Sequence, residues 1–277
     1  MPIPDATARL ALPDWWQALA VRAALPPARP RVALHLDRAP GAPVVGSIEP
    51  ALAARLRDAG LPLRARDGVE CVTGNAEEGL ERIARWLHDH GLSHRWRDEL
   101  LAVTALDDAD ATPLARIERS AVRPLGITTR AVHLIAFTPL GRVWVQQRAL
   151  DKATDPGQWD TLVGGLVAAG ETDADALARE TQEEAGLRVA DLRELRPADR
   201  LTIRRPVAEG YMVERIEVFE AVVPAELEPR NEDGEVERFD CLATDLLLRR
   251  IADGCFTLEA ALMLAASLER SGVHWPR

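Results

Sequence analysis

The chain has 277 residues, 47% of them hydrophobic, and a formal net charge of −10 at pH 7. A chain of this length can bury a full core and predicts two domains. The acidic balance excludes a nucleic-acid-binding surface, which needs a basic stripe that the sequence lacks. The sequence also lacks a membrane-length apolar stretch and the basic start of a signal peptide. Cys71, Cys241 and Cys255 have no metal-binding spacing and indicate free thiols, so we expect a cytoplasmic protein.

The first part of the chain predicts a small α/β domain. Residues 14–25 have the apolar spacing of an amphipathic helix, which Pro26 and Pro27 end. Strands and helices are then expected at residues 31–36, 44–48, 50–60, 63–65, 69–72 and 75–91, the last capped by Asn75. The polar run 107–113, DDADATP, is the best linker candidate. We therefore place an N-terminal domain at residues 1–110 and a second domain at 111–277.

The second domain is rich in strands. Residues 131–137 and 142–147 bracket a Pro-Leu-Gly turn and predict a hairpin. Strands at 201–204, 211–223 and 236–241 would complete a mixed sheet, and helices are expected at 244–251 and 258–268.

Residues 165–187, GLVAAGETDADALARETQEEAGL, predict the helix around which the second domain is organised. Thr172 is a candidate N-cap that forms a capping box with Asp175, and Gly186 fits the position after the last turn. At 100° per residue the two faces differ in character. The expected apolar face consists of Ala174, Leu177, Ala178, Thr181 and Ala185, and the expected charged face of Glu180, Glu183 and Glu184.

The three glutamates on this helix predict a cation site. Like charges at this spacing repel one another, and a bound cation would remove that penalty. Oxygen-only ligands favour Mg²⁺ or Mn²⁺ over zinc. Arg179 can orient a carboxylate, while Gly164 and Gly165 let the backbone approach the metal and a phosphate. A solvated acidic face is the alternative for an isolated pair of glutamates.

The spacing of this stretch resembles the Nudix box, G-x5-E-x7-R-E-U-x-E-E-x-G-U, in which U is a bulky aliphatic residue. The matching residues are Gly165, Glu171, Arg179, Glu180, Glu183, Glu184, Gly186 and Leu187. Only the first U departs, because Thr181 brings a hydroxyl group to an apolar site. The resemblance implies a Nudix α/β/α sandwich with a mixed sheet, preceded here by the small α/β domain.

Residues 147–165 and 229–239 look like one Nudix branch, the proteins associated with thiamine pyrophosphokinase, which carry an extra N-terminal domain. The resemblance implies a hydrolase, a pyrophosphatase that converts damaged thiamine diphosphates, such as oxo or oxy forms, to monophosphates. It makes Glu180, Glu183 and Glu184 the Mg²⁺ ligands, with Gly165 beside them. Glu171 would support the ligands and Arg179 would orient them. Either Glu235 or Glu237 occupies the loop that often supplies another ligand or the base, a role that Glu180 could also fill.

Several residues outside the box are candidates for binding substrate. Arg148 and Lys152, the only lysine, are candidates for phosphate contacts, with surface cations as the alternative. Trp159 could stack on a flat heterocycle, although a Trp beside a glycine-rich strand is more often part of the core. His133, in an apolar strand, is more often a hydrogen-bonded core residue than a base.

Other functions fit parts of the same pattern. The Pro-Gly-x-Trp-Asp run also resembles isopentenyl diphosphate isomerases, but residues 159–166 lack the cysteine that those enzymes use. A Nudix module that senses a ligand without cleaving it, and a hydrolase of another nucleoside diphosphate derivative, are the further alternatives. The expected partner is a small-molecule diphosphate. The N-terminal domain has three open roles: shaping the substrate pocket, forming a homodimer surface, or docking a partner.

Overall fold

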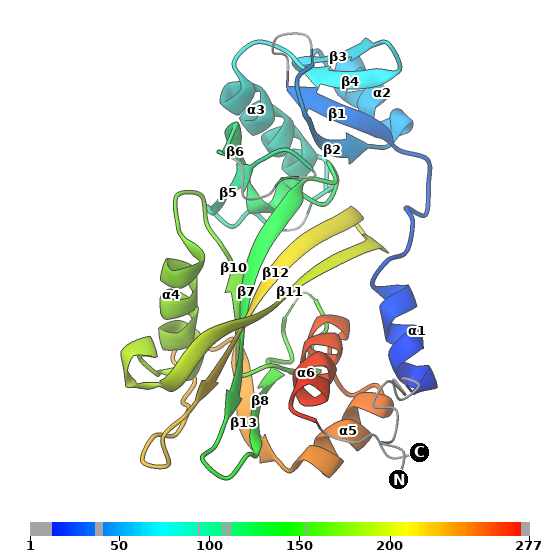
Figure 1. Ribbon diagram of the computed structural model, residues 1–277. Coiled ribbons are helices and arrows are strands. Elements are labelled where there is room, and N and C mark those ends of the chain that lie inside the picture. Colours follow the sequence, from blue (N-terminus) through cyan, green and yellow to red (C-terminus); the bar gives the residue numbers. More distant parts are fainter. Residues whose placement is uncertain are drawn as a thin grey trace.

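The computed structural model describes residues 13–36, 41–93, 95–106, 108, 112–152 and 154–272. A small α/β unit lies at one end of the molecule, and a larger sheet flanked by helices forms the rest (Figure 1). None of the helices in these ranges has the length and apolar character needed to cross a membrane. The linker candidate and the boundary at residues 110/111 lie largely outside the described residues, so the division into two domains stays a prediction.

The N-terminal unit is built on a four-stranded sheet with the order β2-β1-β4-β3. Its helix α3 begins at the expected cap, where the Asn75 side chain accepts hydrogen bonds from the N–H groups of Glu77 and Glu78. The elements are β1 (Val32–Leu36), β2 (Val44–Ile48), α2 (Pro50–Asp58), β3 (Leu63–Arg66), β4 (Val69–Val72) and α3 (Ala76–Asp89). This arrangement confirms the small α/β region.

Two short strands were not expected from the sequence. They are β5 (Leu100–Val103) and β6 (Ala115–Glu118), which pair antiparallel on either side of the linker candidate. The core of the N-terminal unit extends past them to Leu125 and Ile127. The first helix, α1 (Asp14–Arg22), instead lies against the helix α6, where Trp15 and Leu19 pack on the core of the larger sheet.

The larger sheet is mixed, as expected. Its order is β11-β12-β7-β8-β13, with β10 paired to β7 and β9 paired to β8, and β12 and β7 run parallel. Its strands are β7 (Thr128–Phe137), β8 (Val143–Arg148), β9 (Trp159–Asp160), β10 (Val163–Leu166), β11 (Arg193–Val207), β12 (Gly210–Val222) and β13 (Val236–Leu242). β11 begins eight residues before its expected start at Leu201.

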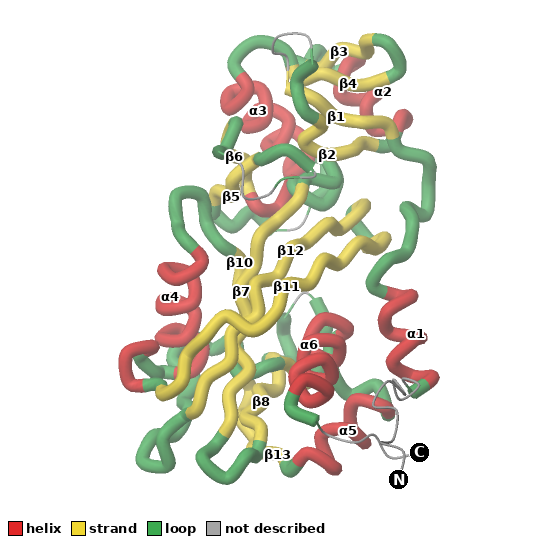
Figure 2. Tube along the Cα trace, viewed as in Figure 1, coloured by secondary structure: helices red, strands yellow, loops and turns green. Residues whose placement is uncertain are grey.

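Helices cover both faces of this sheet (Figure 2). On β7, Val132 and Leu134 face the core beneath α4 (Asp173–Ala185), whereas Ala131 and Ile135 face the core beneath α6 (Leu258–Arg270). This alternation is the period-two pattern of a strand buried on both sides. A third helix, α5 (Thr244–Ala252), joins the α6 side. The α/β/α sandwich is therefore confirmed.

Candidate active site

Helix α4 begins and ends where the sequence predicts. The Thr172 hydroxyl accepts a hydrogen bond from the Asp175 N–H at 3.2 Å, and the Asp175 carboxylate accepts one from the Thr172 N–H at 3.0 Å. Gly186 ends the helix in the left-handed conformation, with φ of 61°. These local signals set where the helix that carries the carboxylates begins and ends.

The buried face of α4 differs from the one expected. Ala174 and Ala178 are exposed, while Ala176 and Glu184 are buried beside the predicted core residues. Ala174 and Ala178 therefore do not belong to the buried face as expected, and Glu184, expected on the charged face, is buried. The reason is the strand β10, which passes so close to the helix that it covers Glu184.

Glu184 is held inside the protein by two donors. Its Oε2 accepts hydrogen bonds from the Gly164 N–H and from Gln146 Nε2, each at 3.0 Å, and the residue is 2% exposed. Burial raises the pKa of the Glu184 carboxyl to about 8. Burial also raises the pKa of Glu180 to about 7, against the opposing charge of Arg179.

Arg179 connects the acidic residues of the helix to the loop before it. Its Nε and Nη2 donate to the two carboxylate oxygens of Glu171 at 2.8 and 3.0 Å, and its Nη1 donates to Glu180 at 2.6 Å and to Glu183 at 3.1 Å. The hydrogen bond from Arg179 lowers the pKa of the Glu171 carboxyl. A planar guanidinium bonded to both oxygens fixes the Glu171 side chain, as expected for a supporting residue.

Gly164 and Gly165 allow the helix and the strand to approach this closely. A Cβ atom at Gly165 would lie 2.0 Å from Cδ of Glu180, and one at Gly164 would lie 2.3 Å from Cε1 of His133. Any larger residue at Gly165 would displace the Glu180 carboxylate. The two glycines thus make room for functional side chains.

The acidic residues of α4 fit a hard divalent cation by their chemistry. The atoms that would coordinate the ion are carboxylate or carbonyl oxygens, the ligands that hard cations prefer. Burial without full charge compensation disfavours the ionised state of Glu180 and Glu184, and a bound cation would supply the missing positive charge. In the conformation described, Glu180 and Glu183 are paired with Arg179 instead. Within the described ranges, no three His, Cys, Asp or Glu side chains converge closely enough to form a metal cluster.

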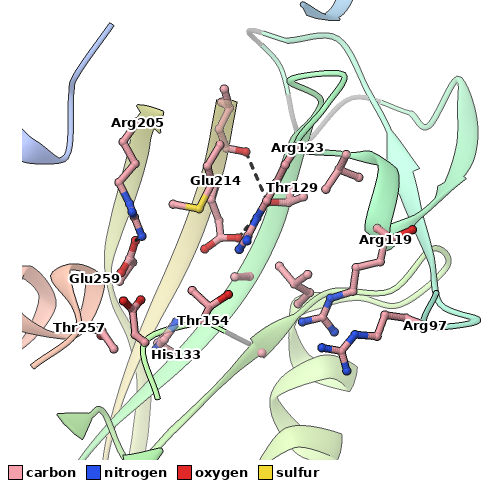
Figure 3. A pocket seen from close by; sticks show the side chains of 18 of the residues that line it. Arg97, Arg119, Arg123, Thr129, His133, Thr154, Arg205, Glu214, Thr257 and Glu259 are labelled. Atoms are coloured by element: carbon pink, nitrogen blue, oxygen red, sulfur yellow. Dashed lines mark hydrogen bonds and ion pairs between the residues drawn. The ribbon is translucent and has the colours of Figure 1, made fainter. Parts of the chain in front are cut away.

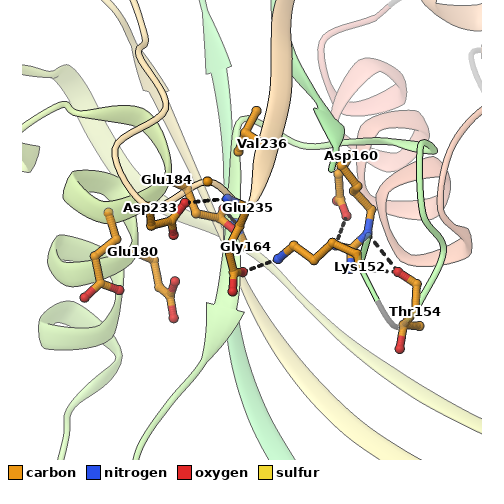
Figure 4. A network of polar contacts seen from close by, with 12 residues as sticks. Lys152, Thr154, Asp160, Gly164, Glu180, Glu184, Asp233, Glu235 and Val236 are labelled. Carbon is orange, nitrogen blue, oxygen red and sulfur yellow. Dashed lines mark hydrogen bonds and ion pairs between the residues drawn. The ribbon is translucent and has the colours of Figure 1, made fainter. Parts of the chain in front are cut away.

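Lys152 lies across from the helix α4 (Figure 4), and both Lys152 and Arg148 pair with acids. Lys152 forms an ion pair with Glu235, the loop residue expected to act as ligand or base. Burial alone would raise the pKa of the Glu235 carboxyl, but Lys152, Arg119 and Arg97 together lower it. Arg148 donates to Asp160 at 3.2 Å. Glu237, the alternative loop residue, is exposed.

Trp159 and His133 occupy core positions. Trp159 is 7% exposed and belongs to the core beneath α6, with the guanidinium groups of Arg238 and Arg250 over its ring. His133 is 8% exposed, and its Nδ1 lies 2.8 Å from the Thr161 hydroxyl. Both positions match the core alternative that the sequence left open. We do not assign Trp159 a stacking role.

A cavity of about 190 Å³ adjoins these residues, between the N-terminal unit and the larger sheet (Figure 3). Gly165, Arg148 and Asp160 line it from the sheet. The other charged residues that line it are Arg95, Arg97, Arg119, Arg123, Asp155, Arg205, Glu214 and Glu259. The charged part of the lining is therefore rich in guanidinium groups, and the rest of the lining is largely apolar.

Comparison with known proteins places this arrangement in a family. The NUDIX domain matches residues 127–255. The chain is 40% identical to an uncharacterised Nudix hydrolase of Pseudomonas aeruginosa over 103 residues, which cover 37% of this chain and 60% of that protein. It is 32% identical to an isopentenyl-diphosphate Delta-isomerase of Streptomyces coelicolor over 137 residues, which cover 49% of this chain and 68% of that protein. Residues 127–255 of the chain form a NUDIX domain.

The chain spans less than two thirds of the first of these relatives, since the match covers 60% of the Pseudomonas protein. Among solved structures, a protein of Deinococcus radiodurans is similar, with a TM-score of 0.49 and 24% identity over 61% of this chain and 98% of that chain.

The sequence did not identify every residue near the Nudix box. Gln146, which holds Glu184, was not expected, nor were Arg95, Arg97 and Arg119 in the cavity. The run Arg95-Trp96-Arg97 is a small basic cluster in an acidic chain, and this contrast was the available signal. Gln146 gave no signal, because a single Gln in a strand has no distinctive spacing.

Proposed function

We propose that this protein is a Mg²⁺-dependent pyrophosphohydrolase that cleaves a diphosphate linkage to release a monophosphate. The observation that carries the proposal is the position of Glu184. Its carboxylate is buried against the Gly164 N–H, one helical turn from Glu180, and the next residue of the strand, Gly165, lines the cavity. A buried carboxylate is costly without a compensating charge, and a divalent cation would supply that charge.

Each residue of the box has a part in this proposal. Glu180, Glu183 and Glu184 would hold the ion. Glu171 holds Nε and Nη2 of Arg179, so that its Nη1 can donate either to the carboxylates or to a phosphate oxygen. When bound, Mg²⁺ or Mn²⁺ polarises phosphoryl oxygens and lowers the pKa of a coordinated water molecule. Glu235, held by Lys152, is our first candidate to accept a proton from the attacking water.

The preferred substrate is a damaged thiamine diphosphate, of the oxo or oxy form. This choice rests on the resemblance of residues 147–165 and 229–239 to the thiamine-associated branch. The cavity beside Gly165, with its apolar and charged lining residues, offers room for part of a group attached to the diphosphate. A nucleoside diphosphate derivative is the alternative.

The test is turnover of oxythiamine diphosphate and of a panel of nucleoside diphosphate derivatives with Mg²⁺, scored as monophosphate and inorganic phosphate. We expect monophosphate from oxythiamine diphosphate. Turnover of another panel member alone would reject the thiamine substrate but keep the reaction, and no turnover of any member would reject the hydrolase.

Substitution of the glutamates separates catalysis from binding. We expect Glu183→Gln and Glu184→Gln to lower kcat about 10²-fold or more, because each removes a carboxylate charge from the ion. Glu81→Gln is the matched control. Glu81 is an exposed helical glutamate that pairs with an arginine four residues away, as Glu183 does, but it lies on α3. Ligand binding with no measurable turnover in the wild-type protein would favour the sensing module.

The same preparation tests the isomerase alternative, which the Streptomyces relative brings forward. Conversion of isopentenyl diphosphate to dimethylallyl diphosphate would establish it. We expect none, because no cysteine lines the described cavity and residues 159–166 contain none.

A further inference from the structure

One wall of the cavity comes from the N-terminal unit and carries three arginines. Arg95 and Arg97 lie just before β5, and Arg119 lies just after β6. In Figure 3, Arg97 and Arg119 reach into the cavity from this wall, opposite Arg205 and Glu259. We call Arg95, Arg97 and Arg119 the arginine wall. No residue of the Nudix box belongs to it.

Backbone hydrogen bonds hold Arg97 and Arg119 of the arginine wall in position. The Arg97 N–H donates to the buried carboxylate of Glu118 at 2.8 Å, and the Arg119 N–H donates to the Glu99 carbonyl at 2.9 Å. The wall is also tied to the loop that precedes α4, because the Ala169 N–H donates to the Leu100 carbonyl at 2.8 Å. The arginines and the box carboxylates are therefore parts of one connected framework.

The arginine wall carries more positive charge than its neighbours neutralise. Arg119 pairs with Glu99 at 2.6 Å. In the parts of the chain that the structure describes, the guanidinium groups of Arg95 and Arg97 have no ion pair and no hydrogen bond, and both residues are exposed. Elsewhere in the cavity, Arg148 and Arg205 are paired with Asp160 and Glu259. The net charge of the chain is −10, so this local excess of positive charge is not a general property of the surface.

The arginine wall also faces the site of the proposed chemistry. The charges of both Arg97 and Arg119 act on Glu235, which pairs with Lys152 next to the box. Unpaired guanidinium groups that converge on such a site suit a phosphate, since each offers a planar pair of N–H donors to two oxygens. The side-chain positions thus favour an anion between the wall and Gly165, the residue of the box that lines the same cavity.

We propose that Arg95, Arg97 and Arg119 form a phosphate subsite, through which the N-terminal unit completes the substrate-binding site. The proposal rests on the proposed function, in that the anion is the diphosphate of the substrate. It assigns one of the three open roles to the N-terminal unit, the shaping of the substrate pocket. It also predicts that substrates with two phosphates bind better than the corresponding monophosphates.

The test measures binding of inorganic pyrophosphate by titration calorimetry, in EDTA and in Mg²⁺. We expect the double variant Arg95→Gln, Arg97→Gln to bind pyrophosphate about tenfold or more weakly in EDTA, because hydrogen bonds to charged groups are lost. Arg116→Gln is the matched control. Arg116 lies on β6, pairs with Glu77 and changes the net charge equally per substitution, but it does not line the cavity. We expect its affinity to stay within about twofold of wild type.

The outcomes separate this inference from the proposed function. Weaker binding by the double variant in a protein that hydrolyses nothing would keep the subsite and reject the hydrolase. An active enzyme whose KM and pyrophosphate affinity survive both substitutions would reject the subsite and keep the hydrolase. Pyrophosphate that binds the wild-type protein only in the presence of Mg²⁺ would also overturn the subsite, since the arginines would then not hold the anion themselves.

Discussion

At the scale of single residues, Thr181 is the position at which the chain departs from the Nudix box. Its side chain is fully buried, and its Oγ1 has no hydrogen-bond partner in the described structure. The expectation that Thr181 would bring a hydroxyl group to an apolar site is confirmed. An unsatisfied buried hydroxyl costs about 1–3 kcal/mol, so the native residue lowers the stability of the fold.

We therefore expect Thr181→Val to raise the midpoint of thermal unfolding by about 2 °C or more. Valine has nearly the same shape and removes only the unpaired oxygen, and Thr181 is not among the residues that line the cavity. Differential scanning calorimetry measures the change. Thr202→Val, at an exposed position on β11, should leave the midpoint unchanged. A lower midpoint for Thr181→Val would show that the hydroxyl group contributes to stability.

At the scale of elements, the sequence predicted those features of α4 that depend on neighbouring residues. Thr172, Asp175 and Gly186 act through contacts within a few positions, so their pattern is sufficient. The buried face depends on β10, and periodicity treats a glutamate such as Glu184 as exposed. β5 and β6 were missed for a related reason, because each has only four residues and is stabilised by pairing across the intervening segment.

The close packing of α4 on β10 predicts that Gly165→Ala strongly lowers the rate of the proposed hydrolysis. The new Cβ would lie 2.0 Å from Cδ of Glu180, so the carboxylate must move by about 1 Å or more. A displacement of that size at a reacting centre costs about 10²-fold in rate. Steady-state kinetics with Mg²⁺ measures it, and circular dichroism confirms the fold.

Gly79→Ala is the control for crowding alone. Its Cβ would lie 2.7 Å from Cγ1 of Val72, in the N-terminal unit and away from the box. We expect this variant to be less stable but to retain kcat. If Gly165→Ala kept wild-type kcat, the position of the Glu180 carboxylate would not matter for the reaction.

At the scale of the whole molecule, the two parts of the chain are coupled. Arg31 donates to the Ser47 hydroxyl at 2.9 Å and to the Pro124 carbonyl at 2.6 Å, which ties the N-terminal sheet to the segment that leads into β7. Leu166 packs against both the N-terminal core and the core beneath α6. The sequence could not predict this coupling, because it depends on contacts between residues about a hundred positions apart.

This coupling predicts that the protein unfolds as one cooperative unit. Leu56 is fully buried in the N-terminal core, and Leu56→Ala should cost about 2–5 kcal/mol. Calorimetry should show a single transition at a lower temperature. Loss of hydrolysis on heating should follow the same curve, because the arginine wall and the box share one framework. The control is Leu140→Ala, whose side chain is 89% exposed and which should leave the transition unchanged. Two transitions, with only the first shifted, would instead show that the N-terminal unit unfolds independently.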